Sequence, residues 1–282
     1  MPTAMEEYLF DLRGYLILEG AVNADHVAEM NAIVDTYTDL EPGEWRGWVQ
    51  RDPRVKSAKH IHQVFEMGEA FERLIDHPGW NDPMNRFIGG DDGLFIDESF
   101  VDVRGKGAAT RLHSGAHKRR IRTQYRYHNE QFRCGQINVL LALTDVGPGD
   151  GGTMILPNSH KSNLIHPAFE GEEGKKSLED VTGAVEVHYK AGDALFFVDC
   201  CAHGSAERVN DGERRIVIMR YGPHWGWDRY GYQPSPELIA RLTPERRKIV
   251  QPLPPKLPPD QSSIYAESES FDYGRNKAVK SG

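Results

Sequence analysis

Two histidines, His113 and His203, are the residues of this sequence best suited by type and position to bind a metal ion. They lie ninety positions apart, and each adjoins apolar, strand-like sequence, so they meet only if the chain folds back on itself as a barrel. Two imidazoles on neighbouring strands are two-thirds of the 2-His-1-carboxylate triad that holds non-haem Fe(II) and leaves coordination positions open. The triad normally reads His-x-Asp plus a distant His, and the Asp position here is Gly115.

The composition is that of an ordinary globular protein. With 34 Lys and Arg against 42 Asp and Glu, the net charge of −8 gives no global attraction to nucleic acid or to a membrane, and we expect neither as a partner. The N-terminal sequence lacks the pattern of a secretory signal, and no apolar run approaches the roughly 18 residues that span a bilayer. The three cysteines do not form a disulfide framework. The sequence predicts a cytoplasmic protein with one domain, 1–282.

The N-terminal region, residues 1–92, is expected to be largely helical around one strand. Residues 10–18 form an apolar β-type run, and a helix follows Asn23, with apolar residues three or four positions apart up to Tyr37. A second helix is expected at about 70–76. Residues 45–62 are polar, aromatic and irregular, which is typical of a loop near a site.

A β-rich core is expected at about 93–222. Apolar runs separated by Gly and Pro turns predict strands, and these runs are 94–96, 100–103, 134–144, 153–156, 185–189, 193–198 and 215–221. Short strands at this spacing favour a sandwich or barrel of jelly-roll type flanked by helices, a mainly β fold of the α+β kind. In the remainder, 223–282, Ser235 and Thr243 each precede Pro and Glu and predict two short helices before a proline-rich tail.

Polar residues within the apolar strands are candidates for the site. Arg214 begins the strand after His203 and can fork onto a carboxylate, or it is a solvated edge charge. Gln136 and Asn138 point to the same side of one strand, so they line a polar site or pair with each other.

Several segments together resemble the phytanoyl-CoA dioxygenase family of Fe(II)/2-oxoglutarate oxygenases. They are 11–15 (DLRGY), 142–145 (ALTD), 155–161 (ILPNSHK), 191–197 (AGDALFF) and His203-Gly204-Ser205 followed by Arg214. The resemblance covers about residues 8–222 and departs from the family at Asn158, where glycine is usual. It implies a double-stranded β-helix that uses Fe(II), 2-oxoglutarate and O2 on an unactivated C–H bond of a small molecule.

The resemblance also implies roles for individual residues. His113 and His203 would bind iron, Arg214 and Ser205 would hold the distal carboxylate of 2-oxoglutarate, and Gln136 or Asn138 would sit beside this cosubstrate.

Gly115 decides which reaction the resemblance predicts. Without a carboxylate at this position, the iron has an open coordination site and one negative charge fewer. A chloride ion can fill the site and replace the charge. Glycine or alanine is similarly found there in Fe(II)/2-oxoglutarate halogenases, so we predict chlorination. Two alternatives stay open: a hydroxylase whose third position is filled by water or by Glu130, Asp145 or Asp150, and a non-catalytic jelly-roll binding protein.

Residues near the first histidine suggest how a substrate binds. The segment 117–122 is strongly basic, so Arg119 and Arg122 could collect a phosphate or carboxylate of the substrate, or belong to a solvated loop. Tyr127 and Trp225 could add flat apolar walls, or pack in a lid. His60, His62 and His160 are read as structural, and Cys200 and Cys201 lack the usual spacing of zinc ligands.

Overall fold

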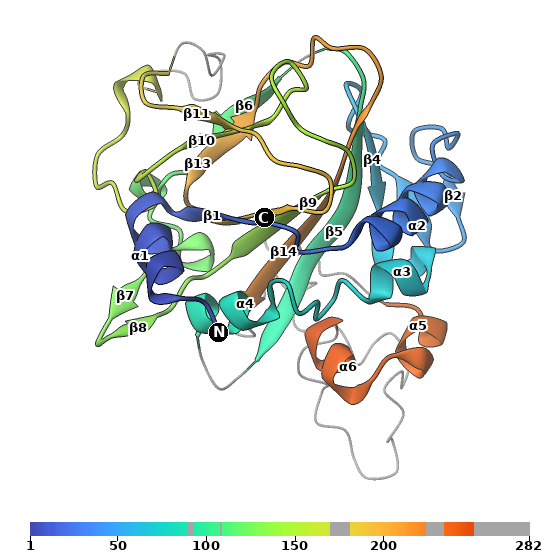
Figure 1. Cartoon of the computed structure of the whole chain (residues 1–282), viewed down its shortest axis with the longest axis horizontal. Helices are drawn as coiled ribbons and strands as arrows, with labels where there is room; N and C mark the ends of the chain where they lie inside the picture. The colour runs from blue at the N-terminus through green and yellow to red at the C-terminus, as the bar shows by residue number, and fades with distance from the viewer. Residues whose placement is uncertain (90–92, 108, 170–180, 224–233, 251–282) are drawn as a thin grey trace, which may run out of the picture.

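Two antiparallel β-sheets form the centre of the protein in the computed structural model, which describes residues 1–89, 93–107, 109–169, 181–223 and 234–250 (Figure 1). The larger sheet contains, from edge to edge, β1 (Tyr15–Leu18), β12 (Ala194–Val198), β9 (Ile137–Ala142), β14 (Arg214–Pro223), β5 (Leu94–Arg104), β4 (Lys59–His62), β3 (Val49–Arg51) and β2 (Trp45–Arg46). The smaller sheet contains β11 (Val185–Val187), β10 (Thr153–Leu156), β13 (Ala202–Ser205) and β6 (Thr110–His113). A separate hairpin is formed by β7 (Tyr127–His128) and β8 (Gln131–Phe132). This is the mainly β, jelly-roll architecture that the sequence predicts.

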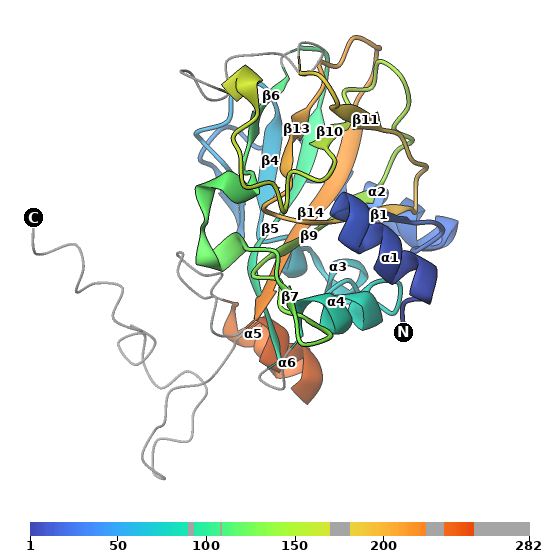
Figure 2. The same ribbon diagram turned by 90° about the vertical axis from the view of Figure 1, so that its left-hand side faces the viewer.

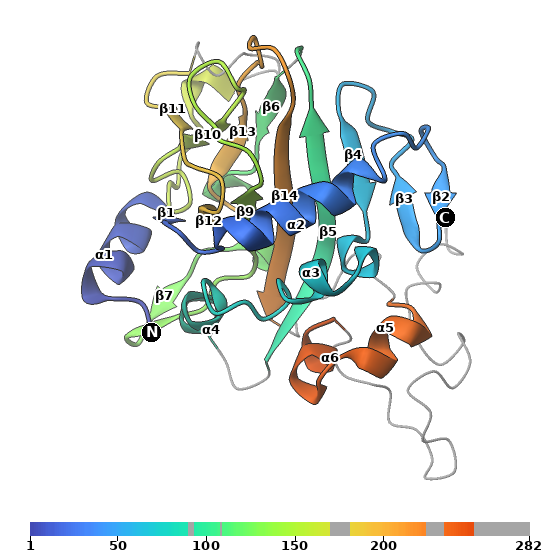
Figure 3. The same cartoon turned by 45° about the vertical axis from the view of Figure 1, so that its right-hand side comes forward.

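Helices cover the outer face of the larger sheet (Figure 3). The α-helices are α1 (Ala4–Arg13), α2 (Ala24–Asp35), α3 (Glu69–Glu72), α4 (Asn81–Ile88), α5 (Pro236–Arg241) and α6 (Pro244–Val250). Short 3-10 helices occur at η1 (Val64–Met67), η2 (Ala116–Lys118), η3 (Ile121–Thr123) and η4 (Pro167–Phe169). As predicted, Asn23 caps α2, and the apolar face of this helix is buried. Figure 2 shows α5 and α6 at the end of the β core opposite β6 and β11.

The two faces of β14 show how the sequence separates the cavity from the core. Side chains alternate along a strand, so every second residue of β14 faces the smaller sheet. These residues are Arg214, Ile216, Ile218 and Arg220. Tyr221 faces the helices instead, where its hydroxyl accepts a hydrogen bond from Trp80 Nε1 (3.1 Å) and lies 2.9 Å from the carbonyl oxygen of Leu74. One strand thus lines a polar cavity and anchors the helical layer.

The N-terminal region differs from the prediction. Residues 10–13 end α1 rather than begin a strand, because Thr3 forms a capping box with Glu6 and Gly14 closes the helix in the left-handed conformation. This region also contains four strands, and residues 45–62, expected as a loop, form three of them. Because β4 pairs with β5, this segment extends the larger sheet and places His60 beside the cavity.

The remaining expectations are mostly met. The runs at 94–96 and 100–103 are one strand, β5, and the helix expected at 70–76 is the short α3 followed by turns. Both C-terminal helices are present, with Ser235 capping α5.

Asn158 has a φ of 67°, a conformation that glycine adopts freely and asparagine better than most other residues. Trp225 and the proline-rich tail lie outside the described residues, and no helix within the described ranges is long and apolar enough to cross a membrane.

Candidate metal and cosubstrate site

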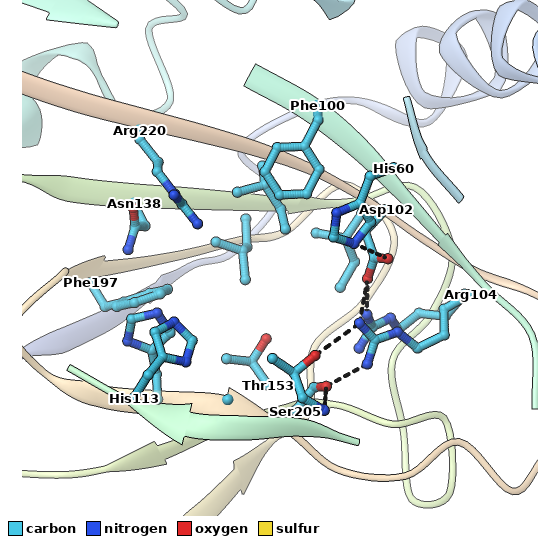
Figure 4. A pocket seen from close by; sticks show the side chains of 17 residues that line it. His60, Phe100, Asp102, Arg104, His113, Asn138, Thr153, Phe197, Ser205 and Arg220 are labelled. Carbon is cyan, nitrogen blue, oxygen red and sulfur yellow. Dashed lines mark hydrogen bonds and ion pairs between the residues drawn. The ribbon is translucent and has the colours of Figure 1, made fainter. Parts of the chain in front are cut away.

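A cavity between the two sheets contains most of the polar residues singled out by the sequence (Figure 4). The enclosed volume of this cavity is about 130 Å³. The larger sheet, including His60 on β4, contributes one wall, and the smaller sheet contributes the other. Its lining includes His60, Phe100, Asp102, Arg104, Thr110, His113, Asn138, Leu140, Thr153, Phe197, His203, Ser205, Arg214, Ile216, Ile218 and Arg220.

His113 and His203 lie side by side at one end of this cavity. They occupy opposite positions on the paired strands β6 and β13, and their ring centroids are 4.2 Å apart. Nδ1 of His113 lies 2.9 Å from the carbonyl oxygen of Arg111, and Nδ1 of His203 lies 2.7 Å from that of Cys201. Because a carbonyl oxygen only accepts, both Nδ1 atoms donate, and each Nε2 keeps a lone pair that can bind a metal ion.

The surroundings of both imidazoles favour the neutral form that binds metals. Burial lowers the pKa of His203, and the neighbouring His113 lowers it further. Burial is also the largest effect on His113 and lowers its pKa, although this side chain keeps accessible surface where it faces the open cavity. The donor set therefore fits Fe(II), for which histidine and carboxylate are common ligands.

Asp199 is a carboxylate beside the two histidines that the sequence reasoning missed. It directly follows the apolar strand β12 and is 7% exposed. Its oxygens accept hydrogen bonds from Asn138 Nδ2 (3.1 Å) and, at longer range, from Ser114 Oγ (3.4 Å). Burial alone would raise the pKa of Asp199, but His203, Arg220 and the Asn138 hydrogen bond hold it below its usual value. The carboxylate is therefore ionised.

The far end of the cavity carries two arginines from neighbouring strands. Arg214 binds Asp102 and the carbonyl oxygen of Gly151, while Arg104 donates to Ser205 Oγ and to Thr110 Oγ1. Asp102 also contacts Arg104 (3.5 Å) and His60 Nε2 (3.2 Å). Burial would raise the pKa of Asp102, but His60 and the two arginines lower it instead. Two guanidinium groups and one carboxylate leave this end one positive charge in excess.

Arg104, Asp102 and Arg220 were not identified in the sequence, although a signal for them exists. Along β5, Phe100, Asp102 and Arg104 alternate with apolar residues, and Arg220 lies an even number of positions after Arg214 on β14. The same period of two that reveals an apolar face also marks charged residues that share a face. Figure 4 shows Arg220 and Asn138 pointing into the cavity opposite His113.

Gly115 lies at the start of η2 with a φ of 107°, and it lines a separate surface cavity with His117. The other carboxylates considered for the third position are elsewhere. Glu130 is exposed in the turn between β7 and β8, Asp145 pairs with Lys190, and Asp150 pairs with Arg208. Among the residues that the structure describes, no three His, Cys, Asp or Glu side chains are close enough together to hold a metal ion as they stand.

The other predicted site residues are dispersed. Gln136 does not line the cavity and instead contacts Asp97 (3.2 Å) and Arg122 (3.0 Å). The guanidinium group of Arg122 therefore contacts Gln136 and Asp97 inside the protein. Arg119 is exposed, and Tyr127 is exposed with its ring 4.8 Å from that of Phe132.

The buried cysteines are structural in their contacts. Cys200 Sγ lies 3.4 Å from the carbonyl oxygen of His160, and Cys201 Sγ lies 3.4 Å from that of Leu156. Both thiols therefore donate to backbone carbonyl oxygens.

The paired histidines at one end of this cavity and the arginines at the other are an arrangement that suits a metal-dependent oxygenase. The chain belongs to the phytanoyl-CoA dioxygenase family, whose model matches residues 10–216. It is an enzyme of this class, as the resemblance in the sequence implied.

Similarities to individual proteins are consistent with membership of this family. The ectoine dioxygenase of Streptomyces coelicolor is 23% identical over 231 residues, which cover 74% of each chain. The structure is similar to that of HygX from Streptomyces hygroscopicus with nickel and 2-oxoglutarate bound, with a TM-score of 0.67, 21% identity, and coverage of 79% of this chain and 88% of that one. It is also similar to the α-ketoglutarate-dependent epimerase SnoN, with a TM-score of 0.56, 17% identity, and coverage of 81% and 90%. At these identities the structural likeness establishes the fold.

Proposed function

We propose that this enzyme uses Fe(II), 2-oxoglutarate and O2 to oxidise an unactivated C–H bond of a small molecule. The observation that carries the proposal is that one cavity joins the histidine pair to an end with one excess positive charge. A dicarboxylic cosubstrate needs both features, a metal ion for its keto acid and a cation for its distal carboxylate. Membership of the phytanoyl-CoA dioxygenase family and the 2-oxoglutarate bound to HygX support the same conclusion.

The residues at the arginine end divide the work of binding 2-oxoglutarate. Arg104 and Ser205 would bind the distal carboxylate, since Arg104 is already hydrogen-bonded to Ser205 and both line the cavity. Arg214, the residue expected from the sequence, would add its charge while Asp102 and the Gly151 carbonyl fix its guanidinium. Asn138 lies at the histidine end, on the wall opposite His113.

Fe(II) held by His113 and His203 would supply the O2-dependent chemistry that breaks the C–H bond. The protein orients the metal by fixing both Nδ1 atoms on backbone carbonyls, so that both Nε2 atoms are free. Phe100, Leu140 and Ile218 give the middle of the cavity an apolar lining that excludes water.

Oxygenation is the outcome we favour, because the site contains an ionised carboxylate, Asp199, next to the histidines. The iron then has a carboxylate available even though residue 115 is glycine. Chlorination is the second candidate, and Gly115 is the observation that favours it, since this position offers no side-chain ligand. The two outcomes differ in what occupies the third position on the iron.

The substrate we propose is a small molecule with a carboxylate or phosphate group. Arg220 offers its guanidinium to the cavity near the histidines, while its Nη1 atom binds Glu98 (2.6 Å). Arg119 is exposed after η2 and could attract the same group from solution.

Succinate release tests the proposal. Purified protein incubated with Fe(II), ascorbate, 2-oxoglutarate and O2 should form succinate, slowly without substrate and faster with a suitable one. His203→Ala should abolish succinate formation, whereas His188→Ala, which removes a histidine that lines a different surface cavity, should not. Equal succinate formation by wild type and His203→Ala would contradict the proposal.

A further inference from the structure

We propose that Asp199 is the third protein ligand of the iron and replaces the carboxylate that Gly115 lacks. This inference rests on the proposed Fe(II)-dependent function and specifies its metal site. It differs from the sequence prediction, in which chloride, water, or an oxygen of Glu130, Asp145 or Asp150 fills the iron position that Gly115 leaves open.

The position of Asp199 in the fold directs its side chain toward the histidines. The backbone N–H of Asp199 donates to the Gln136 carbonyl oxygen (2.9 Å), so the pairing of β12 with β9 continues to this residue. Phe197, two positions earlier, shares its face, and the Phe197 ring lies 4.7 Å from that of His203. Asp199 therefore follows Phe197 toward the histidine end of the cavity.

The partners of the carboxylate place it at the segment where a family member would carry its own aspartate. Ser114, which lies between His113 and Gly115, contacts one oxygen of Asp199, and Asn138 contacts the other. The chain thus brings a carboxylate from the β12–β13 turn to the residue next to position 115. The 3.4 Å contact with Ser114 is the longer of the two, and releasing it leaves that oxygen free to turn toward a metal ion.

Without a metal ion, the side chains around Asp199 use only part of the hydrogen-bonding capacity of its carboxylate. A carboxylate accepts about four hydrogen bonds, and a buried one needs them or a cation. Within the described residues, one amide and one distant hydroxyl are the side chains that donate to it. Asp102 is the carboxylate that lines the cavity itself within the described part of the chain. It is already held by His60 and two arginines. Asp199 remains as the carboxylate that can serve Fe(II).

Ligation by Asp199 predicts a specific response to chloride. If Asp199 binds the iron, all three coordination positions that belong to the protein are filled and chloride cannot enter them. Removal of this carboxylate opens one of them to chloride. An anaerobic complex with Fe(II) and 2-oxoglutarate should therefore show a charge-transfer band that is indifferent to chloride in the wild type. In Asp199→Ala the band should change saturably as chloride is added.

The affinity for Mn(II) alone provides a second readout that requires no turnover and no 2-oxoglutarate. Asp199→Ala and the isosteric Asp199→Asn should each bind Mn(II) at least about 10-fold more weakly than wild type. Asp199→Asn retains an acceptor for Asn138 and controls for folding. Asp52→Asn removes a carboxylate that is equally buried but pairs with Arg54, and it should bind Mn(II) like wild type.

The outcomes separate this inference from the function on which it rests. Unchanged Mn(II) affinity in Asp199→Asn, or a wild-type band that responds to chloride as strongly as that of Asp199→Ala, would overturn Asp199 ligation and leave the oxygenase function standing. A wild-type chain that binds Mn(II) through Asp199 but forms no complex with 2-oxoglutarate would support the ligand and contradict the function. Absence of Mn(II) binding by the wild type would overturn both.

Discussion

His113 and His203 lie opposite each other on paired antiparallel strands, with ring centroids 4.2 Å apart and each Nδ1 directed to the backbone carbonyl two residues earlier. The same local hydrogen bond thus fixes both rings, and it leaves both Nε2 atoms available to one metal ion. Asn138 and Arg220 lie at the same end of the cavity as this pair, and Arg104 and Arg214 lie at the other end.

Removal of either imidazole should weaken metal binding strongly. His113→Ala and His203→Ala each eliminate one of the two nitrogen donors, so we expect the affinity for Ni(II) to fall about 100-fold or more. Isothermal titration calorimetry with Ni(II) measures this directly. His188→Ala is the matched control, and an affinity loss of the same size in this variant would contradict the assignment of the site.

Replacement of Arg104 should weaken 2-oxoglutarate binding and spare the metal. Arg104→Gln removes a charged donor to the distal carboxylate, and hydrogen bonds to charged groups contribute about 1.5–3 kcal/mol, which corresponds to about 10- to 100-fold in affinity. The measurement is 2-oxoglutarate binding to the Ni(II)-loaded protein. Arg208→Gln removes an equally buried arginine that binds Asp150. If both variants bind 2-oxoglutarate like wild type, Arg104 has no role in the site.

A side chain at position 115 should destabilise the protein. The φ of 107° disfavours any non-glycine residue, and a Cβ atom would lie 2.6 Å from His117 Nδ1. We expect Gly115→Ala to lower the free energy of unfolding by about 1–3 kcal/mol, measured by urea denaturation. In a His117→Ala background the cost should shrink but persist, because the backbone strain remains.

Gly105→Ala is the control for this experiment, since its Cβ would meet no atom within 4 Å. A Gly115→Ala cost no larger than that of Gly105→Ala would mean that the loop relaxes without penalty. For the same reason, Gly115→Asp would introduce a carboxylate and a strained turn at once, so its effects on metal binding and on folding would not be separable.

The apoprotein should lose stability as the pH falls below 6.5. Burial lowers the pKa of His160 to about 4, so between pH 6.5 and 4 the unfolded chain binds a proton that the folded chain does not. This group alone contributes a slope of about 1.4 kcal/mol per pH unit in that window, with stability rising as pH rises. Urea denaturation at pH 7, 6 and 5 should show a smaller slope in His160→Gln than in wild type, and an equal slope in the two proteins would contradict this prediction.

The sequence predicts the features of this structure that depend on local patterns. Apolar runs and Gly or Pro turns identify the β core, and the Asn23 and Ser235 caps identify two helices. The strands β2 to β4 were missed because they are short and polar, and they form only by adding to the edge next to β5. Their pairing is a tertiary interaction that no local pattern encodes.

The sequence likewise predicts those residues of the candidate site that lie in recognisable local patterns. The sequence predicts His113, His203, Ser205, Arg214 and Asn138 as site residues, and all five line the cavity. Asp199 follows a uniformly apolar strand, and no period in the sequence shows that it meets Ser114, 85 positions earlier. The pairing of Arg214 with Asp102 likewise depends on the alignment of β14 with β5, which only the folded sheet provides.

An anaerobic optical titration tests the central claim, that the cavity binds Fe(II) and 2-oxoglutarate together, most directly. Fe(II) is added to the apoprotein, followed by 2-oxoglutarate, and the visible charge-transfer band of an iron-bound keto acid is followed. We predict a band that saturates at one Fe(II) per chain, is absent in His203→Ala and needs more 2-oxoglutarate in Arg104→Gln. No band in the wild-type protein, or an unchanged band in His203→Ala, would contradict this claim.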